Sequence, residues 1–200
     1  ILVDQLEGDP FDWALVKLQD SPAEQTLVKD VVDSLRFAQD DERIQAVVLQ
    51  LDGLEGGGLS KLQAVGNAID EVRSAGKKVI AMGDGYTQAQ YYLASRADEI
   101  FMHDFGLVLI DGYGYYKAYL RGALEKLQID VNIFRVGEYK SFVEPYLRDD
   151  MSEEDKIASR QWLNALWGAY QTDVVSARGL QPGALDAYAN STVELLKATQ

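Results

Sequence analysis

Helical apolar stripes alternate with short, continuous apolar runs along this 200-residue chain, and this alternation constrains the fold most strongly. Residues 27–35 carry apolar side chains at helical spacing, and residues 46–51 follow as a run that suits a buried strand. A second helical stripe over 59–72 is closed by Gly76, and the next strand is predicted over 78–82. The repeated step from helix to strand predicts an α/β protein with a parallel sheet and crossover helices.

The second half of the chain continues this alternation. Ser152 followed by three acidic residues is a capping signal, which predicts a long helix that runs to about Ala177 and is broken by Gly179. Two hundred residues with 47% apolar content fit one domain with a sizeable core, so a single domain is expected over residues 1–200, and no fixed-period repeat or low-complexity tract is present. The other predicted elements are helices near 88–96 and 115–127 and strands over 99–102, 107–110 and 131–136.

Composition excludes several classes of function. The net charge of -13 would repel a phosphate backbone, so nucleic acid is not an expected partner. No cysteine is present, which excludes disulfides and thiolate chemistry, and neither a metal nor another cofactor is expected. No apolar run reaches the roughly 18 to 20 residues that span a bilayer, so the chain itself is expected to be soluble.

Three segments carry a resemblance to a known family. They are Arg-Val-Gly-Glu-Tyr-Lys-Ser at 135–141, which continues to Met151, the stretch Ala-Met-Gly-Asp-Gly-Tyr-Thr-Gln-Ala-Gln-Tyr-Tyr-Leu-Ala-Ser at 81–95, and Gly-Tyr-Tyr-Lys-Ala at 114–118. Together they resemble the amino-terminal half of the long members of the protease IV family, the bacterial signal peptide peptidases of the A type. The resemblance covers nearly the whole chain.

The resemblance implies a crotonase-like, ClpP-like fold of stacked β-β-α units and a Ser-Lys endopeptidase that degrades cleaved signal peptides. In such proteins a lysine of the amino-terminal half activates a serine of a homologous carboxy-terminal half. Further implications are a membrane anchor before the matching region, a domain that faces the periplasm from the bacterial inner membrane, and a homo-oligomer. The expected partners are signal peptides, other apolar peptides and the serine-bearing half.

Lys140 is the residue that the resemblance marks as the general base. A neutral amine can accept the serine proton, so its pKa must be lowered from about 10.4 towards 7 or 8. Arg135 is the nearest cation in the sequence, whereas Glu138 and Glu144 would raise the pKa if they faced the amine. Burial is therefore expected to dominate, and Ser141 is a candidate for orienting the lysine.

Gly56 and Gly57 are candidates for binding an oxyanion or substrate. They belong to a glycine triplet between a predicted strand and a predicted helix, where backbone amides can face a ligand, although a flexible turn has the same composition. The resemblance aligns both glycines with an oxyanion-hole turn of the family's catalytic half, with Glu55 in place of a proline.

The serine position is where this chain departs from a self-sufficient enzyme. The resemblance aligns Ala89 with the nucleophile of the catalytic half, and a methyl group cannot attack a carbonyl. Thr87 carries a hydroxyl two positions earlier, displaced from the aligned direction. His103 is the sole histidine and is expected to be structural or exposed, because no nucleophile-elbow pattern accompanies it.

The acidic and the aromatic residues of the chain each have a structural and a functional interpretation. Acids at 149–150 and 153–155 surround a helix start, where the helix dipole favours negative charge, and they lack the histidine or cysteine of a metal site. Aromatic residues could line a groove for an apolar peptide or pack within the fold. They are Tyr91, Tyr92, Tyr113, Tyr115, Tyr116, Tyr119, Phe142 and Tyr146.

Three hypotheses remain at this stage. The first is the lysine-contributing half of a Ser-Lys endopeptidase, and the second is a non-catalytic oligomerisation and peptide-binding module in which Lys140 is dispensable. The third is an acyl-CoA enzyme of the wider crotonase superfamily, which would need a basic patch for CoA that this acidic chain does not display.

Overall fold

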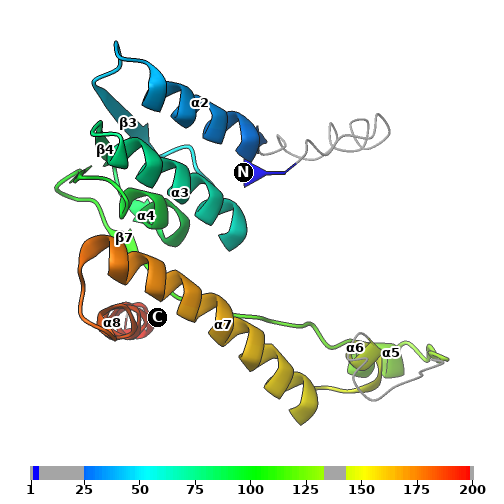
Figure 1. The fold of residues 1–200 in the computed structure, drawn as a ribbon. Coiled ribbons are helices and arrows are strands. Elements are labelled where there is room, and N and C mark those ends of the chain that lie inside the picture. Colours follow the sequence, from blue (N-terminus) through cyan, green and yellow to red (C-terminus); the bar gives the residue numbers. More distant parts are fainter. Residues whose placement is uncertain (1, 5–24, 133–142, 199–200) are drawn as a thin grey trace. The chain divides into compact units, whose positions relative to one another are not determined.

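A computed structural model describes residues 2–4, 25–132 and 143–198 of the chain, with side chains of the last helix described only to residue 191. Contacts divide the chain into two compact units, one of residues 1–111 and 170–200 and the other of residues 112–169. The two units are described separately below. The ribbon is drawn in Figure 1.

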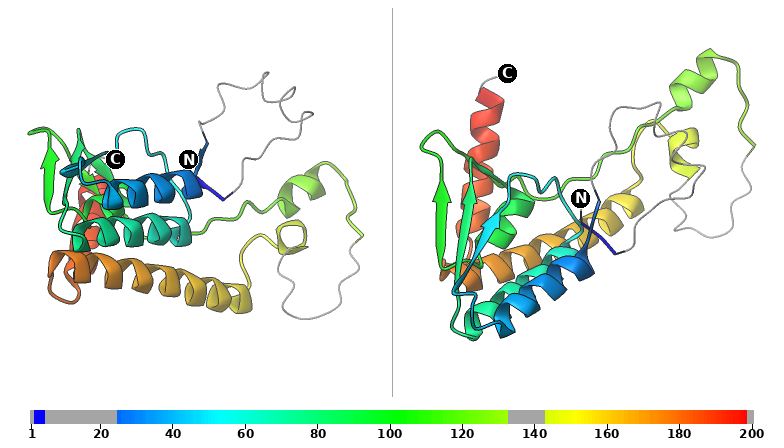
Figure 2. Two further views of the ribbon diagram at one scale, coloured as in Figure 1. Left: turned by 45° about the horizontal axis from the view of Figure 1, so that its top comes forward. Right: turned by 90° about the horizontal axis from the view of Figure 1, so that it is seen from above.

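The larger unit is built on a three-stranded parallel sheet of order β3-β4-β6. These strands are β3 (Ala46–Gln50), β4 (Lys78–Gly83) and β6 (Glu99–Met102). Helix α2 (Val28–Asp40) precedes β3, and α3 (Leu59–Ser74) connects β3 to β4. The order of elements therefore confirms the predicted parallel α/β arrangement, and the two helices lie side by side in both views of Figure 2.

A second, smaller parallel pair accompanies this sheet. Strand β5 (Tyr86–Thr87) follows β4 directly and leads into α4 (Gln88–Ala94), while β7 (Val108–Leu109) follows β6. Strand β4 pairs with β6, and β5 pairs with β7. The segment β4-β5 and the later segment β6-β7 therefore each contribute one strand to each of the two sheets. A third pair, β1 (Leu2–Val3) with β2 (Thr26–Leu27), is also parallel.

The core of the larger unit lies between the main sheet and its helices. Val79 and Ala81 of β4 are completely buried on the face where α3 and α4 contact this strand. Ile69 and Val72 of α3 are buried with them, at the spacing predicted for the inner face of a helix. The opposite face of the sheet is different, because Val48 in β3 is 56% exposed where the sequence predicted a buried strand.

The carboxy-terminal helices confirm the predicted capping signal. Helix α7 (Glu153–Arg178) begins directly after Ser152, whose Oγ accepts a hydrogen bond from the Asp155 amide at 3.2 Å. Gly179 ends it with a φ of 61°, a left-handed conformation that glycine adopts without strain. Helix α8 (Ala184–Ala198) follows. Residues 153–169 of α7 belong to the smaller unit and the rest to the larger one.

The smaller unit also contains α5 (Arg121–Lys126) and α6 (Glu144–Leu147). The predicted helix over 115–127 is therefore too long at its start. Two aromatic rings of residues 113–120 instead contact α7 edge to face, Tyr113 against Trp167 and Tyr115 against Trp162. Most of the strand predicted over 131–136 lies outside the described residues, and Val131 and Asn132 have no regular structure.

Candidate functional site

The glycine triplet lies in the loop between β3 and α3, as the sequence predicted. The Leu2 amide donates a hydrogen bond to the Gly56 carbonyl at 3.0 Å, so β1 is attached to this loop. Gly57 is close to the Leu2 side chain, because a Cβ atom at position 57 would lie 3.1 Å from the Leu2 Cβ. Only a glycine fits this approach without displacing Leu2.

Two backbone amides of this loop are candidates for binding a ligand. Gly58 is the N-cap of α3, and its carbonyl accepts hydrogen bonds from the amides of Lys61 and Leu62. Among the described residues, none accepts a hydrogen bond from the amide of Gly57 or Gly58. Two neighbouring donors before a helix are suited to an oxyanion or a peptide carbonyl.

Gln90 attaches the same loop to the start of α4. Its Nε2 donates to the Leu54 carbonyl at 3.0 Å, and its Oε1 accepts from the Thr87 amide at 2.8 Å. The Thr87 hydroxyl accepts in turn from the Gln90 amide, which completes a capping box. Gln90 is buried, so this one side chain fixes the distance between the β3–α3 loop and the first turn of α4.

The residue aligned with the nucleophile, Ala89, lies in this first turn of α4 and is partly buried. It supplies no hydroxyl. The hydroxyl of Thr87 acts as the helix cap. The structure therefore assigns Thr87 a structural role as the cap of α4.

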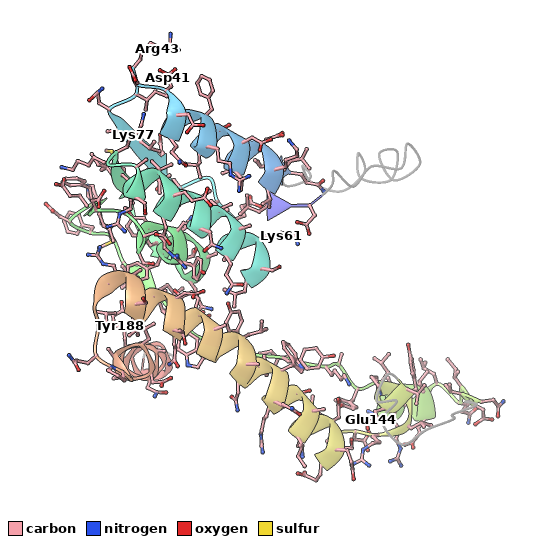
Figure 3. The ribbon with its side chains drawn as sticks, in the orientation of Figure 1. Asp41, Arg43, Lys61, Lys77, Glu144 and Tyr188 are labelled. Atoms are coloured by element: carbon pink, nitrogen blue, oxygen red, sulfur yellow. The ribbon has the colours of Figure 1, made fainter. Side chains whose placement is uncertain are left out.

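Lys140, the predicted general base, lies outside the described residues, as do Arg135, Glu138 and Ser141. Its role stays a prediction. Glu144 is described and belongs to α6, where Figure 3 labels it. Its carboxylate accepts two hydrogen bonds from Ser152, one from Oγ at 2.5 Å and one from the amide at 3.2 Å.

A buried ion pair lies beside this carboxylate in the smaller unit. Lys117 Nζ is 2.5 Å from Asp155 Oδ2, and both side chains are largely buried. Burial opposes the charged amine, yet the hydrogen bond and charge of Asp155 outweigh it and raise the pKa of Lys117. Lys117 also lies 5.7 Å from the centre of the Tyr115 ring. This lysine is therefore held as a cation, unlike the neutral amine that a base requires.

A second cluster, centred on buried Tyr92 and Arg96, connects α3, α4 and the last turns of α7. The Tyr92 hydroxyl donates to Asp173 at 2.6 Å and accepts from Arg96 at 3.0 Å, and Arg96 also bonds Asp70. Gln63 donates to Asp173 at 3.0 Å. Burial, followed by the hydrogen bond to Asp173, raises the pKa of Tyr92. The cluster holds α4 on its supporting helices.

The structure also describes the histidine and several of the tyrosines that the sequence analysis considered. His103 is exposed, its Nδ1 accepts from the Phe105 amide at 3.2 Å, and no metal-binding group of three His, Cys, Asp or Glu residues occurs in the described ranges. Of the tyrosines predicted to line a groove, Tyr92 is completely buried in the core, whereas Tyr116 is 93% exposed. Within the described part of the chain, no helix is long and apolar enough to cross a membrane.

The parallel sheets with crossover helices define an α/β domain. Its candidate site is lined by the backbone of the glycine loop, which Gln90 connects to the start of α4. The model of peptidase family S49 matches residues 71–200. The chain is 43% identical to Protease 4 of Haemophilus influenzae over 84% of its length, and 38% identical to Protease 4 of Salmonella typhi over 82%. It is also 25% identical to the chloroplastic serine protease SPPA of Arabidopsis thaliana over 76% of its length.

The chain belongs to peptidase family S49, and the resemblance seen in its sequence is thereby confirmed. It spans 28%, 27% and 22% of the lengths of these three relatives.

Proposed function

We propose that this chain is the lysine-contributing half of a Ser-Lys endopeptidase that degrades cleaved signal peptides. The observation that carries the proposal is the 43% identity to a Protease 4 over 84% of the chain, together with an S49 match over residues 71–200 that includes Lys140. Serine chemistry within this chain is not supported at the aligned position, because Ala89 has no nucleophilic atom.

The proposed reaction divides its groups between two halves. Neutral Lys140 accepts the proton of a serine hydroxyl from the homologous half, and the serine oxygen attacks the peptide carbonyl. Collapse of the tetrahedral intermediate breaks the peptide bond, and the departing amine takes the proton from Lys140. Water then attacks the acyl-enzyme, with Lys140 again as the base, and releases the carboxylate product.

Gly56 and Gly57 have a related role in this proposal. Since no nucleophile accompanies them in this half, their loop binds the carbonyl groups of an extended peptide instead of a reacting oxyanion. The amides of Gly57 and Gly58, which have no acceptor among the described residues, support this role, and the hydrogen bond from Gln90 to the Leu54 carbonyl holds the loop in place.

A crotonase-like fold of stacked β-β-α units is part of the same proposal. It is supported by the order β4-β5-α4 followed by β6-β7, with strand partners taken from successive passes of the chain. The family resemblance supports the remaining elements: a homo-oligomer, a membrane anchor outside this chain, and a periplasmic face at the bacterial inner membrane.

The test is hydrolysis of a fluorogenic signal-peptide mimic by the full-length protein. Lys140→Ala should lower turnover by about 10²- to 10⁴-fold, and Lys140→Arg should do the same because a guanidinium stays protonated. Lys126→Ala, which removes an exposed lysine from the last turn of α5, is the matched control and should retain turnover.

Folding and assembly of each variant are compared by circular dichroism and sedimentation. Near-normal turnover of Lys140→Ala with assembly intact would exclude the base assignment. The chain would then be a non-catalytic oligomerisation and peptide-binding module.

A further inference from the structure

Within the part of the chain that the structure describes, one face of the main sheet is open to solvent. The register places Val48 beside Ile80, and Gln50 beside Met82, which in turn pairs with Phe101. Side chains at paired positions of a parallel sheet point to the same face. On this face Val48, Met82 and Phe101 are 56%, 47% and 53% exposed, so apolar side chains of all three strands are in contact with solvent.

An open face is unusual for a parallel sheet, because crossover helices normally cover both sides. The opposite face follows the rule, since Val79 and Ala81 are completely buried under α3 and α4. Contiguous exposed apolar side chains on a folded domain commonly mark a surface that binds a partner. The open face of β3, β4 and β6 therefore has the character of a binding surface.

The surface contains a hollow at the carboxyl ends of its strands. Its volume is about 410 Å³, and Met82, Phe101 and Met102 supply apolar lining. Asp52 and Asp84, which follow β3 and β4, lie at its edge. Carboxyl ends of parallel strands are where ligands bind in open α/β sheets.

The two ends of this surface differ in charge. At the amino end, Lys78 pairs with Glu99 at 2.6 Å, so the two charges compensate each other. At the carboxyl end, Asp52 Oδ1 accepts a hydrogen bond from the Asp84 amide at 2.8 Å, and both residues are exposed. The hollow thus combines an apolar floor with a negative end, in a chain whose net charge is already -13.

We propose that this face binds an extended peptide whose apolar side chains contact Met82 and Phe101 and whose cationic group lies at Asp52 and Asp84. The inference rests on the proposed function, because signal peptides join a positively charged segment to an apolar one. It assigns the recognition of that charge to side chains at the carboxyl ends of β3 and β4, in addition to the backbone amides proposed for the glycine triplet.

The experiment measures binding without catalysis. Fluorescence anisotropy of two labelled apolar peptides, identical except that an amino-terminal Lys-Lys is replaced by Gln-Gln in one, gives Kd values with full-length Lys140→Ala protein. The cationic peptide should bind more tightly. Adding Asp52→Asn and Asp84→Asn should reduce this preference by about two- to ten-fold, as expected for exposed charge pairs. Raising the salt concentration should reduce the preference for the cationic peptide in the protein that keeps Asp52 and Asp84.

Matched variants separate this surface from general charge and folding effects. Asp52→Asn keeps an oxygen that can accept the Asp84 amide, so the loop geometry is preserved. Asp40→Asn with Glu42→Gln removes two exposed charges outside the hollow and should leave the preference unchanged. Phe101→Ala should weaken both peptides by about three- to ten-fold, since it removes apolar contact area.

The following outcomes would overturn the proposed peptide-binding role of this face. Equal affinity for the two peptides, or a preference that survives Asp52→Asn and Asp84→Asn, would exclude recognition of charge here. A change in oligomeric state by sedimentation after Phe101→Ala, with peptide affinity unchanged, would assign the face to a second copy of the chain. Failure of the proposed function is separate, because it appears as turnover retained in Lys140→Ala with no change in these Kd values.

Discussion

The buried cluster around Tyr92 provides a quantitative test of the packing of α4. Tyr92→Phe removes one hydroxyl and keeps the ring, which is completely buried and lies 5.6 Å from the Tyr170 ring. The lost hydroxyl donates to Asp173 and accepts from Arg96. Hydrogen bonds to charged groups contribute about 1.5 to 3 kcal/mol, and Asp173 keeps its bond from Gln63. The free energy of unfolding should therefore fall by about 2 kcal/mol.

The change in the free energy of unfolding is measured by urea unfolding monitored by circular dichroism. In a separate thermal unfolding experiment, Tm should fall by roughly 4 to 8 °C, because a chain of this size loses about 2 to 4 °C per kcal/mol. Tyr91→Phe is the matched control on the same helix, because its hydroxyl bonds no other described residue. It should change stability by less than about 0.5 kcal/mol.

The pH dependence of stability gives a second readout of the same group. Burial and Asp173 raise the pKa of Tyr92, so the folded protein holds the phenolic proton more tightly than the unfolded chain does. Its contribution is complete below the unfolded pKa of about 10 and is lost as pH rises above that value. Stability should fall less steeply above pH 10 in Tyr92→Phe. Equal stability of the two proteins at neutral pH, or parallel alkaline curves, would refute the assigned hydrogen bonds.

Two further changes test the smaller unit. Ser152→Ala removes the cap of α7 and a donor to buried Glu144, and should lower stability by about 1 to 2 kcal/mol in urea unfolding; Ser152→Thr should recover most of it. Lys117→Met leaves Asp155 buried without its partner and should cost about 3 to 5 kcal/mol, while Lys117→Met with Asp155→Leu should be closer to the unsubstituted protein. Single and double variants of equal stability would contradict a buried ion pair.

Sequence patterns predicted the elements whose signals are local. The stripe over 59–72 and the closing Gly76 gave α3, the apolar run at 78–82 gave β4, and the segment 99–102 coincides with β6. Ser152 was identified as a cap because its partner is only three residues away. These elements depend on neighbours in the chain, so one sequence contains their evidence.

Contacts between residues far apart in the chain could not be predicted from the sequence in this way. Asp70 belongs to α3, Asp173 to α7 and Arg96 to the turn after α4, and no spacing rule brings these three residues together. The over-long helix predicted near 115–127 reflects the same limit, since the rings of Tyr113 and Tyr115 contact tryptophans about 50 residues away. Gln90 was recognisable, because Thr87 and Gln90 have the capping-box spacing, although its bond to the Leu54 carbonyl was not.

The double pairing of β4 with β6 and β5 with β7 has a consequence for how the domain forms. Both pairings join residues about 20 positions apart, so each pass of the chain closes against the one synthesised just before it. Growth of this kind resembles that of solenoid proteins, in which a unit contacts chiefly its neighbours and order can spread from any starting point. The parallel strands of the larger unit are therefore suited to pairing progressively during translation, whereas residues 170–200 of the same unit pack against α4 only after they have been made.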